Sequence, residues 1–123
     1  MDYKKKLGGW GETIAAEYLA GKGYIILERN IRTQYGEIDL IALDKEILVF
    51  VEVKTRTSRK FGYPEEAISL KKKEHLLASA QAYLQTHQEL ERDWRIDVLA
   101  IERIDRNSLP EITQFENIIT DTG

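Results

Sequence analysis

The sequence contains no cysteine. Disulfide bonds, thiolate zinc sites and cysteine nucleophiles are therefore excluded, and such a chain suits a reducing compartment. No stretch approaches the roughly 20 apolar residues of a membrane span. Residues 1–12 are basic and then glycine-rich, and they lack the apolar run of a signal peptide. We therefore expect a cytoplasmic protein without a membrane partner.

The chain also lacks features that would divide it. Its 123 residues contain no repeat, low-complexity tract or linker, so residues 1–123 should form a single domain. The net charge is −3, which by itself argues against a nucleic-acid partner. However, the local balance is +5 over residues 54–73 and −5 over residues 89–123. This asymmetry suggests one positive face on an acidic body, although ordinary solvated surface is the commoner cause of such runs.

Hydrophobic periodicity predicts two main helices and five strands in the order α-β-β-β-α-β-β. The helices are expected over residues 11–21 and about 69–87, with Ser69 capping the second and Pro64 opening a short helix before it. The strands are expected over residues 24–31, 37–43, 46–55, 94–104 and 111–119. Residues 47–51 are apolar on both faces, so the third strand should be central. A three-strand meander followed by a crossover helix implies an α/β fold with a mixed central sheet flanked by helices.

The strongest functional signal is a charged pair at the end of this apolar run. Glu52 and Lys54 are two residues apart on a strand and therefore share a face. Ionised groups near a core are costly unless they are paired or bind an ion. A two-residue turn at residues 44–45 would set Asp39 opposite Phe50 and diagonal to Glu52. Cross-strand diagonals of roughly 7–8 Å allow two carboxylates to bind one cation.

Asp39, Glu52 and Lys54 together make a coherent hydrolytic site. The two carboxylates would hold Mg²⁺ or Mn²⁺ through oxygen ligands. The cation would polarise a phosphodiester and lower the pKa of bound water, while Lys54 would orient the water or stabilise charge on the phosphate. The alternative is structural: a strand-end salt bridge between Glu52 and Lys54, with Asp39 as a carboxylate near a turn. The residues alone do not separate these two hypotheses.

Short motifs extend this pattern from residue 11 to residue 98. They are Gly11-Glu12, Arg29-Asn30-Ile31-Arg32, Gly36-Glu37-Ile38-Asp39-Leu40, residues 49–56 with the sequence VFVEVKTR, Phe61-Gly62, Lys72 and Arg95-Ile96-Asp97-Val98. In these motifs the chain resembles the YraN-like family of small bacterial predicted endonucleases, which are related to archaeal Holliday-junction resolvases.

The resemblance implies a restriction-endonuclease-like fold of the PD-(D/E)XK superfamily. Asp39 would be the motif aspartate and Glu52-Val53-Lys54 the E-x-K element, with Ile38 in place of the motif's proline. The resemblance also implies that Glu12 joins Asp39 and Glu52 at the metal. The alternative for Glu12 is a carboxylate near the start of a helix, favoured there by the helix dipole.

Four basic residues are the candidate DNA contacts: Arg32, Arg56, Lys60 and Lys72. Lys72 matches a lysine of the family, whereas its neighbours Lys71 and Lys73 are better explained as a solvated helix face. Arg56, Arg59 and Lys60 precede Phe61 and Tyr63. Basic residues interleaved with aromatic ones can grip phosphates and stack on unpaired bases. We expect Phe61 itself to anchor this segment to the core.

We therefore expect a Mg²⁺- or Mn²⁺-dependent endodeoxyribonuclease without a small-molecule cofactor, with branched or junction DNA among its candidate substrates. A homodimer would match the two-fold symmetry of a four-way junction. One alternative is a nucleic-acid-binding module without cleavage. Another is a hydrolase that uses Glu37 and Glu52 as an acid–base pair across the hairpin, but the neighbouring lysine and basic segment suit phosphate better than sugar.

Overall fold

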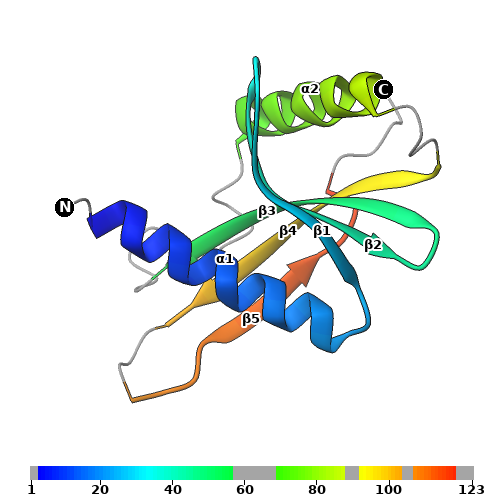
Figure 1. Cartoon of the computed structure of the whole chain (residues 1–123). Coiled ribbons are helices and arrows are strands. Elements are labelled where there is room, and N and C mark those ends of the chain that lie inside the picture. Colours follow the sequence, from blue (N-terminus) through cyan, green and yellow to red (C-terminus); the bar gives the residue numbers. More distant parts are fainter. Residues whose placement is uncertain (1–2, 57–68, 88–91, 104–106, 119–123) are drawn as a thin grey trace.

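The computed structural model describes residues 3–56, 69–87, 92–103 and 107–118. The elements are α1 (Tyr3–Gly21), β1 (Ile25–Thr33), β2 (Gly36–Asp44), β3 (Ile47–Arg56), α2 (Leu70–Thr86), β4 (Trp94–Glu102) and β5 (Glu111–Phe115) (Figure 1). This order confirms the predicted arrangement of two main helices and five strands. The short helix expected at Pro64 lies outside the described residues. Neither α1 nor α2 combines the length and apolar character that a membrane crossing needs.

The five strands form one mixed sheet in the order β1-β2-β3-β4-β5. The first three strands are an antiparallel meander. Strand β4 then pairs parallel to β3 and antiparallel to β5. The parallel pair requires a crossover, which α2 supplies between β3 and β4. The predicted mixed α/β fold is therefore confirmed, and β3 is its central strand.

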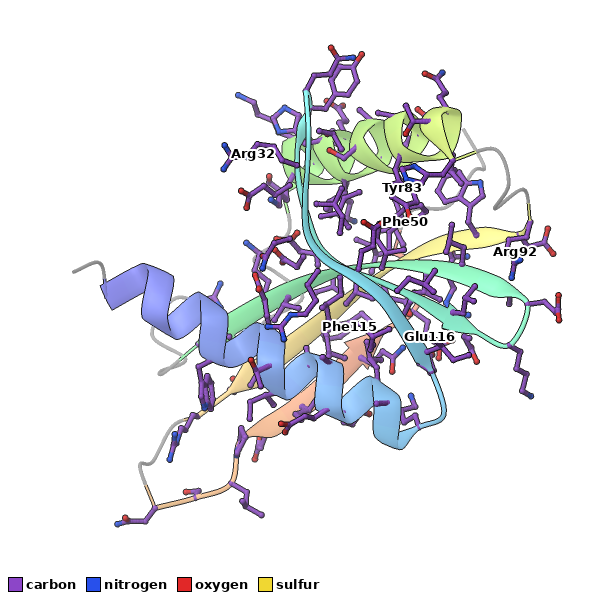
Figure 2. The ribbon with its side chains drawn as sticks, in the orientation of Figure 1. Arg32, Phe50, Tyr83, Arg92, Phe115 and Glu116 are labelled. Atoms are coloured by element: carbon purple, nitrogen blue, oxygen red, sulfur yellow. The ribbon has the colours of Figure 1, made fainter. Side chains whose placement is uncertain are left out.

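The two helices cover opposite faces of the sheet (Figure 1). Ala15 and Leu19 of α1 pack on a cluster that includes Val49 and Val51 of β3. The alternate residues of β3 face α2, because successive side chains of a strand point to opposite sides. Figure 2 shows Phe50 beneath α2 close to Tyr83, and their rings meet edge to face at 5.7 Å. This double coverage explains the continuous apolar run of β3.

Some element boundaries differ from the prediction. Helix α1 begins at Tyr3 rather than near residue 11. Strands β4 and β5 end earlier than predicted, at Glu102 and Phe115. After β5, Asn117 has a positive φ of 52°, and its N–H donates to the side chain of Asp97 at 2.9 Å. At Asn117 a side-chain acceptor therefore takes the place of a main-chain acceptor on the neighbouring strand. Hydrophobic periodicity in the sequence does not reveal where such a change ends a strand.

The capping of α2 agrees with the prediction. The Ser69 hydroxyl accepts a hydrogen bond from the N–H of Lys72 at 3.1 Å. The helix ends at Thr86, with His87 as its C-terminal cap. The Ser69 side chain thereby satisfies one of the free N–H groups of the first turn.

The predicted turn at residues 44–45 is wrong by one residue. Asp44 is still in β2, where it pairs with Ile47, and the turn is Lys45-Glu46 with φ 56° at Lys45. The Asp44 carboxylate pairs with Arg95 of β4 at 3.3 Å. The register of β2 and β3 changes accordingly, with consequences for Asp39.

Candidate active site

Followed outward from the hairpin turn, the pairing of β2 with β3 ends one residue short of Asp39. The last paired residues are Leu40 and Val51. If the same register is continued, Asp39 lies opposite Glu52. The sequence had instead predicted Phe50 opposite Asp39, with Glu52 on the diagonal. The next N–H along β3, that of Val53, donates to the carboxylate Oδ2 of Asp39 at 2.8 Å. A side chain thus takes over the contact between the two strands at the point where they separate.

The neighbouring strand β1 is irregular at the same position. Its pairing with β2 on either side sets Asn30 opposite Asp39, and Asn30 has φ 53°. Asparagine is among the few residues that tolerate this left-handed conformation. Beyond it, the β1–β2 hairpin curves toward α2 (Figure 1), where Thr33 Oγ1 donates to Ser79 Oγ at 3.0 Å. The bend carries the hairpin away from β3 and leaves Asp39 and Glu52 at the junction.

Two lysines contact the buried Glu52. Its residue surface is only 5% exposed. The ammonium of Lys54 lies 3.9 Å from Glu52 Oε1, which confirms that these residues share a strand face. The ammonium of Lys72, from the first turn of α2, lies 3.4 Å from the same oxygen. The site therefore draws on three elements, β2, β3 and α2.

The pKa of Asp39 is raised to about 7. Burial is the main cause, and the negative charge of Glu52 adds to it. The hydrogen bond from Val53 acts in the opposite direction and lowers the pKa of Asp39. A carboxyl with this pKa is partly protonated at neutral pH, so a cation that binds there competes with a proton.

The pKa of Glu52 is also raised. Burial is again the main cause, while the charges of Lys72 and Lys54 lower the pKa of Glu52. Two neighbouring carboxyls in a buried position cannot both ionise without cost. A bound divalent cation would remove that cost, so the donor set fits a hard metal ion.

Glu12 is the third carboxylate near this point. Its charge raises the pKa of Asp39, although Arg29 of β1 lies 3.9 Å from the Glu12 carboxylate. The preceding residue, Gly11, lies so close to β3 that an added Cβ would overlap the side chain of Thr55. Helix α1 can approach β3 there because residue 11 has no side chain. Even so, no three Asp, Glu or His side chains within the described ranges form a ready-made metal cluster.

The four predicted DNA contacts lie in different surroundings. Lys72 points at Glu52 and belongs to the acidic centre. Arg56 is half-buried at the end of β3. Arg32 is on the β1–β2 hairpin, on the part that contacts α2 (Figure 2); its side chain is 82% exposed and pairs with Glu37 at 2.8 Å. Lys60 lies outside the described residues, as do Arg59, Phe61 and Tyr63.

The alternative in which Glu37 and Glu52 form an acid–base pair across the hairpin is contradicted by the strand pairing. Pairing between β2 and β3 ends at Leu40, and Glu37 lies in the part of the hairpin that pairs with β1 alone. Its carboxylate is engaged by Arg32, and about half of its side chain is exposed. The two glutamates therefore do not face each other.

The sequence pattern did not predict the contact between Lys72 and Glu52. The buried stripe of α2 contains Leu76, Ala80 and Tyr83. Lys72 lies one turn before Leu76 on the same stripe, so helical spacing directs this lysine inward. The four-residue spacing between Lys72 and Leu76 was therefore the signal in the sequence that could have predicted this contact.

One family model covers all five residues of the candidate site and its surroundings, which are Glu12, Asp39, Glu52, Lys54 and Lys72. Residues 11–101 match the Uncharacterised protein family UPF0102. The chain belongs to this family.

A UPF0102 protein of Syntrophotalea carbinolica is 45% identical over 116 residues, which cover 94% of this chain and 93% of the relative. The UPF0102 protein of Alkaliphilus oremlandii is 44% identical over 115 residues, covering 92% and 97%. That of Caldanaerobacter subterraneus subsp. tengcongensis is 48% identical over 98 residues, or 80% of each chain. The YraN-like resemblance is thereby confirmed at the level of the family.

Proposed function

We propose that this UPF0102 protein is a metal-dependent endonuclease that hydrolyses DNA phosphodiesters. One observation carries the proposal: the Asp39 carboxylate, held by the N–H of Val53, lies close enough to Glu52 for the charge of Glu52 to raise its pKa, and Glu52 in turn contacts Lys54. Two carboxylates suit a hard divalent cation, and an adjacent ammonium suits a phosphate. The assignment to the PD-(D/E)XK superfamily is part of the same proposal and rests on the Asp39 and Glu52-Val53-Lys54 motif on this α/β fold.

Asp39 and Glu52 would hold Mg²⁺ or Mn²⁺, with Glu12 as a third carboxylate within electrostatic reach. When bound, the cation supplies polarisation of the phosphodiester and a lower pKa for its water. The protein's own part is to keep the carboxylates in position through the Val53 N–H bond and to bring a cationic side chain to the phosphate. Lys54 has this second role, because it shares a strand face with Glu52 and is about one-third exposed.

The DNA would approach along the side of the molecule where β3 and α2 meet the β1–β2 hairpin. Arg32, Arg56 and Lys60 are the proposed phosphate contacts, and the last two belong to the positively charged residues 54–73. Branched or junction DNA belongs to the proposal because of the family's relation to Holliday-junction resolvases. Two matched cuts in a four-way junction would require a dimer, or one site that acts twice.

Cleavage assays test this function directly. Labelled duplex, single-stranded, flap and four-way-junction DNA should be incubated with Mg²⁺, with Mn²⁺ or with EDTA. We expect cleavage of at least one substrate with either metal and none with EDTA, and Asp39→Asn should abolish it. Cleavage that persists in EDTA, or in the Asp39→Asn variant, would contradict the proposed site.

A second candidate function is a nucleic-acid-binding module without cleavage. The observation that favours it is the pairing of Glu52 with Lys54 and Lys72, which satisfies much of the buried charge without a metal. This function requires DNA binding that weakens with salt but does not respond to divalent ions beyond their ionic strength. Binding in EDTA without cleavage under any of the conditions above would support it.

A further inference from the structure

Two ammonium groups converge on one carboxylate oxygen in this structure. Lys72 Nζ lies 3.4 Å from Glu52 Oε1, and Lys54 Nζ lies 3.9 Å from the same atom. The two lysines differ in how they reach it. Lys54 is two residues along the same strand, whereas Lys72 comes from α2 on the other side of the crossover.

The main chain of Lys72 is well anchored. Its N–H is bonded to the capping hydroxyl of Ser69. The helix is tied to the β1–β2 hairpin by the bond between Thr33 and Ser79, and to the sheet by the packing of Tyr83 on Phe50. The side chain of Lys72 is nevertheless 36% exposed, against 7% for Glu52. The ammonium therefore lies at the rim of the site, on a long flexible stem that can turn outward without any movement of the helix.

A divalent cation at Glu52 would conflict with this arrangement. A metal on the carboxylate would lie within a few ångströms of both ammonium groups, and like charges at such distances repel strongly outside bulk water. At least one lysine must then leave Glu52. Both lysine side chains are about one-third exposed, at 36% for Lys72 and 32% for Lys54. Lys72 is the better candidate, because it reaches Glu52 from another element, whereas Lys54 has its proposed role at the phosphate beside Glu52 on β3.

We propose that Lys72 is a metal-released DNA contact: it pairs with Glu52 when no metal is bound, and it turns to a DNA phosphate when a divalent cation occupies Asp39 and Glu52. This inference rests on the proposed function and adds a coupling between metal and substrate. Before metal binds, Lys72 competes with the cation for Glu52. After metal binds, the released ammonium lies beside the position of a metal-bound phosphate, which is its natural new partner.

The coupling requires opposite effects of one substitution on two ligands. In the Lys72→Met variant without DNA, Mn²⁺ measured by titration calorimetry should bind roughly two- to fivefold more tightly, since a competing ion pair is gone. DNA binding should change in the other direction. With Ca²⁺ in place of Mg²⁺ to prevent turnover, the variant should bind a labelled duplex more weakly, with a salt slope shallower by about one unit. In EDTA, the slopes of wild type and variant should agree.

Two variants control this experiment. Lys71→Met removes a lysine from the adjacent, exposed position of the same helical turn and should leave Mn²⁺ affinity unchanged. Lys72→Arg retains the charge and should restore the Ca²⁺-dependent part of the salt slope. Thermal unfolding of each variant establishes that the compared proteins are folded.

The outcomes separate this inference from the proposed function. If wild type binds no Mn²⁺, both fail. If wild type binds Mn²⁺ but Lys72→Met binds it equally or less well, only the inference fails, and Lys72 is then a structural partner of Glu52. A slope difference of the same size in EDTA and in Ca²⁺ would also overturn it, because Lys72 would then contact DNA whether or not metal is bound.

Discussion

The main-chain N–H of Val53 donates a hydrogen bond to Oδ2 of Asp39 at 2.8 Å. Val53 is the middle residue of the Glu52-Val53-Lys54 motif, so one bond ties the aspartate of β2 to the acid and the lysine of β3. It forms where regular pairing between these strands has ended. The carboxylate of Asp39 is thus both a structural link and a candidate metal ligand.

Asp39→Asn should abolish Mn²⁺ binding without unfolding the protein. The amide oxygen can still accept the bond from Val53, but it brings no negative charge to the cation. Calorimetry with Mn²⁺ measures the loss, and circular dichroism verifies the fold. Glu37→Gln is the matched control, because Glu37 is an exposed acid on the same strand that pairs with Arg32. Equal losses in the two variants would show a general charge effect instead of a site.

Stability should fall as pH rises toward 7 when no metal is present. The pKa of Asp39 is raised to about 7 in the folded state from the model-compound value of 3.8. Between these values the folded state binds more protons than the unfolded state, so the stabilising contribution is complete below the lower value and is lost as pH rises through the higher one.

The pH effect can be measured by urea denaturation in EDTA at about pH 5 and about pH 8. Asn does not ionise, so Asp39→Asn should gain stability relative to wild type between these two values, by an amount on the order of 1–3 kcal/mol. Saturating Mn²⁺ should reduce the difference by stabilising the ionised wild-type site. Parallel pH curves for wild type and variant in EDTA would show that Asp39 is not the titrating group.

Lys54→Ala should reduce DNA cleavage by roughly 100-fold or more while DNA affinity changes little, because its charge is needed mainly in the transition state. Single-turnover kinetics and binding in Ca²⁺ separate the two quantities. The variant should lose little stability, since Glu52 keeps Lys72 at 3.4 Å. A large loss of affinity with normal turnover would make Lys54 a binding residue.

Gly11→Ala should destabilise the protein by roughly 1–3 kcal/mol, because the new Cβ overlaps the side chain of Thr55. Mn²⁺ affinity should fall as well, since the shift of α1 displaces Glu12. Chemical denaturation and calorimetry measure the two effects. Gly9→Ala is the control: no atom lies within 4 Å of a Cβ added there, so the substitution should be neutral or stabilising.

A second substitution can test the cause of this effect. Thr55→Ser removes the methyl group that the added Cβ would meet, so Gly11→Ala combined with Thr55→Ser should recover much of the lost stability. Additive effects of the two substitutions would mean that Gly11 matters for another reason, such as backbone freedom in the helix.

The amino-acid sequence by itself determined the order of the elements and the central place of β3. These properties depend on local periodicity: an apolar stripe every three to four residues gives a helix, and an apolar run on both faces gives a covered strand. The common face of Glu52 and Lys54 follows from the two-residue period of a strand in the same way. The Ser69 cap of α2 was predictable for similar local reasons.

Only the tertiary structure decided what surrounds Asp39. The turn at Lys45-Glu46 sets the strand register, and Asp44 beside this turn pairs with Arg95 of a strand about fifty residues away. The approach of Lys72 to Glu52 and the contact of Gly11 with Thr55 likewise join elements that are distant in the chain. Such contacts depend on how helices and strands pack in three dimensions, whereas periodicity constrains only the face that each element presents to its neighbours.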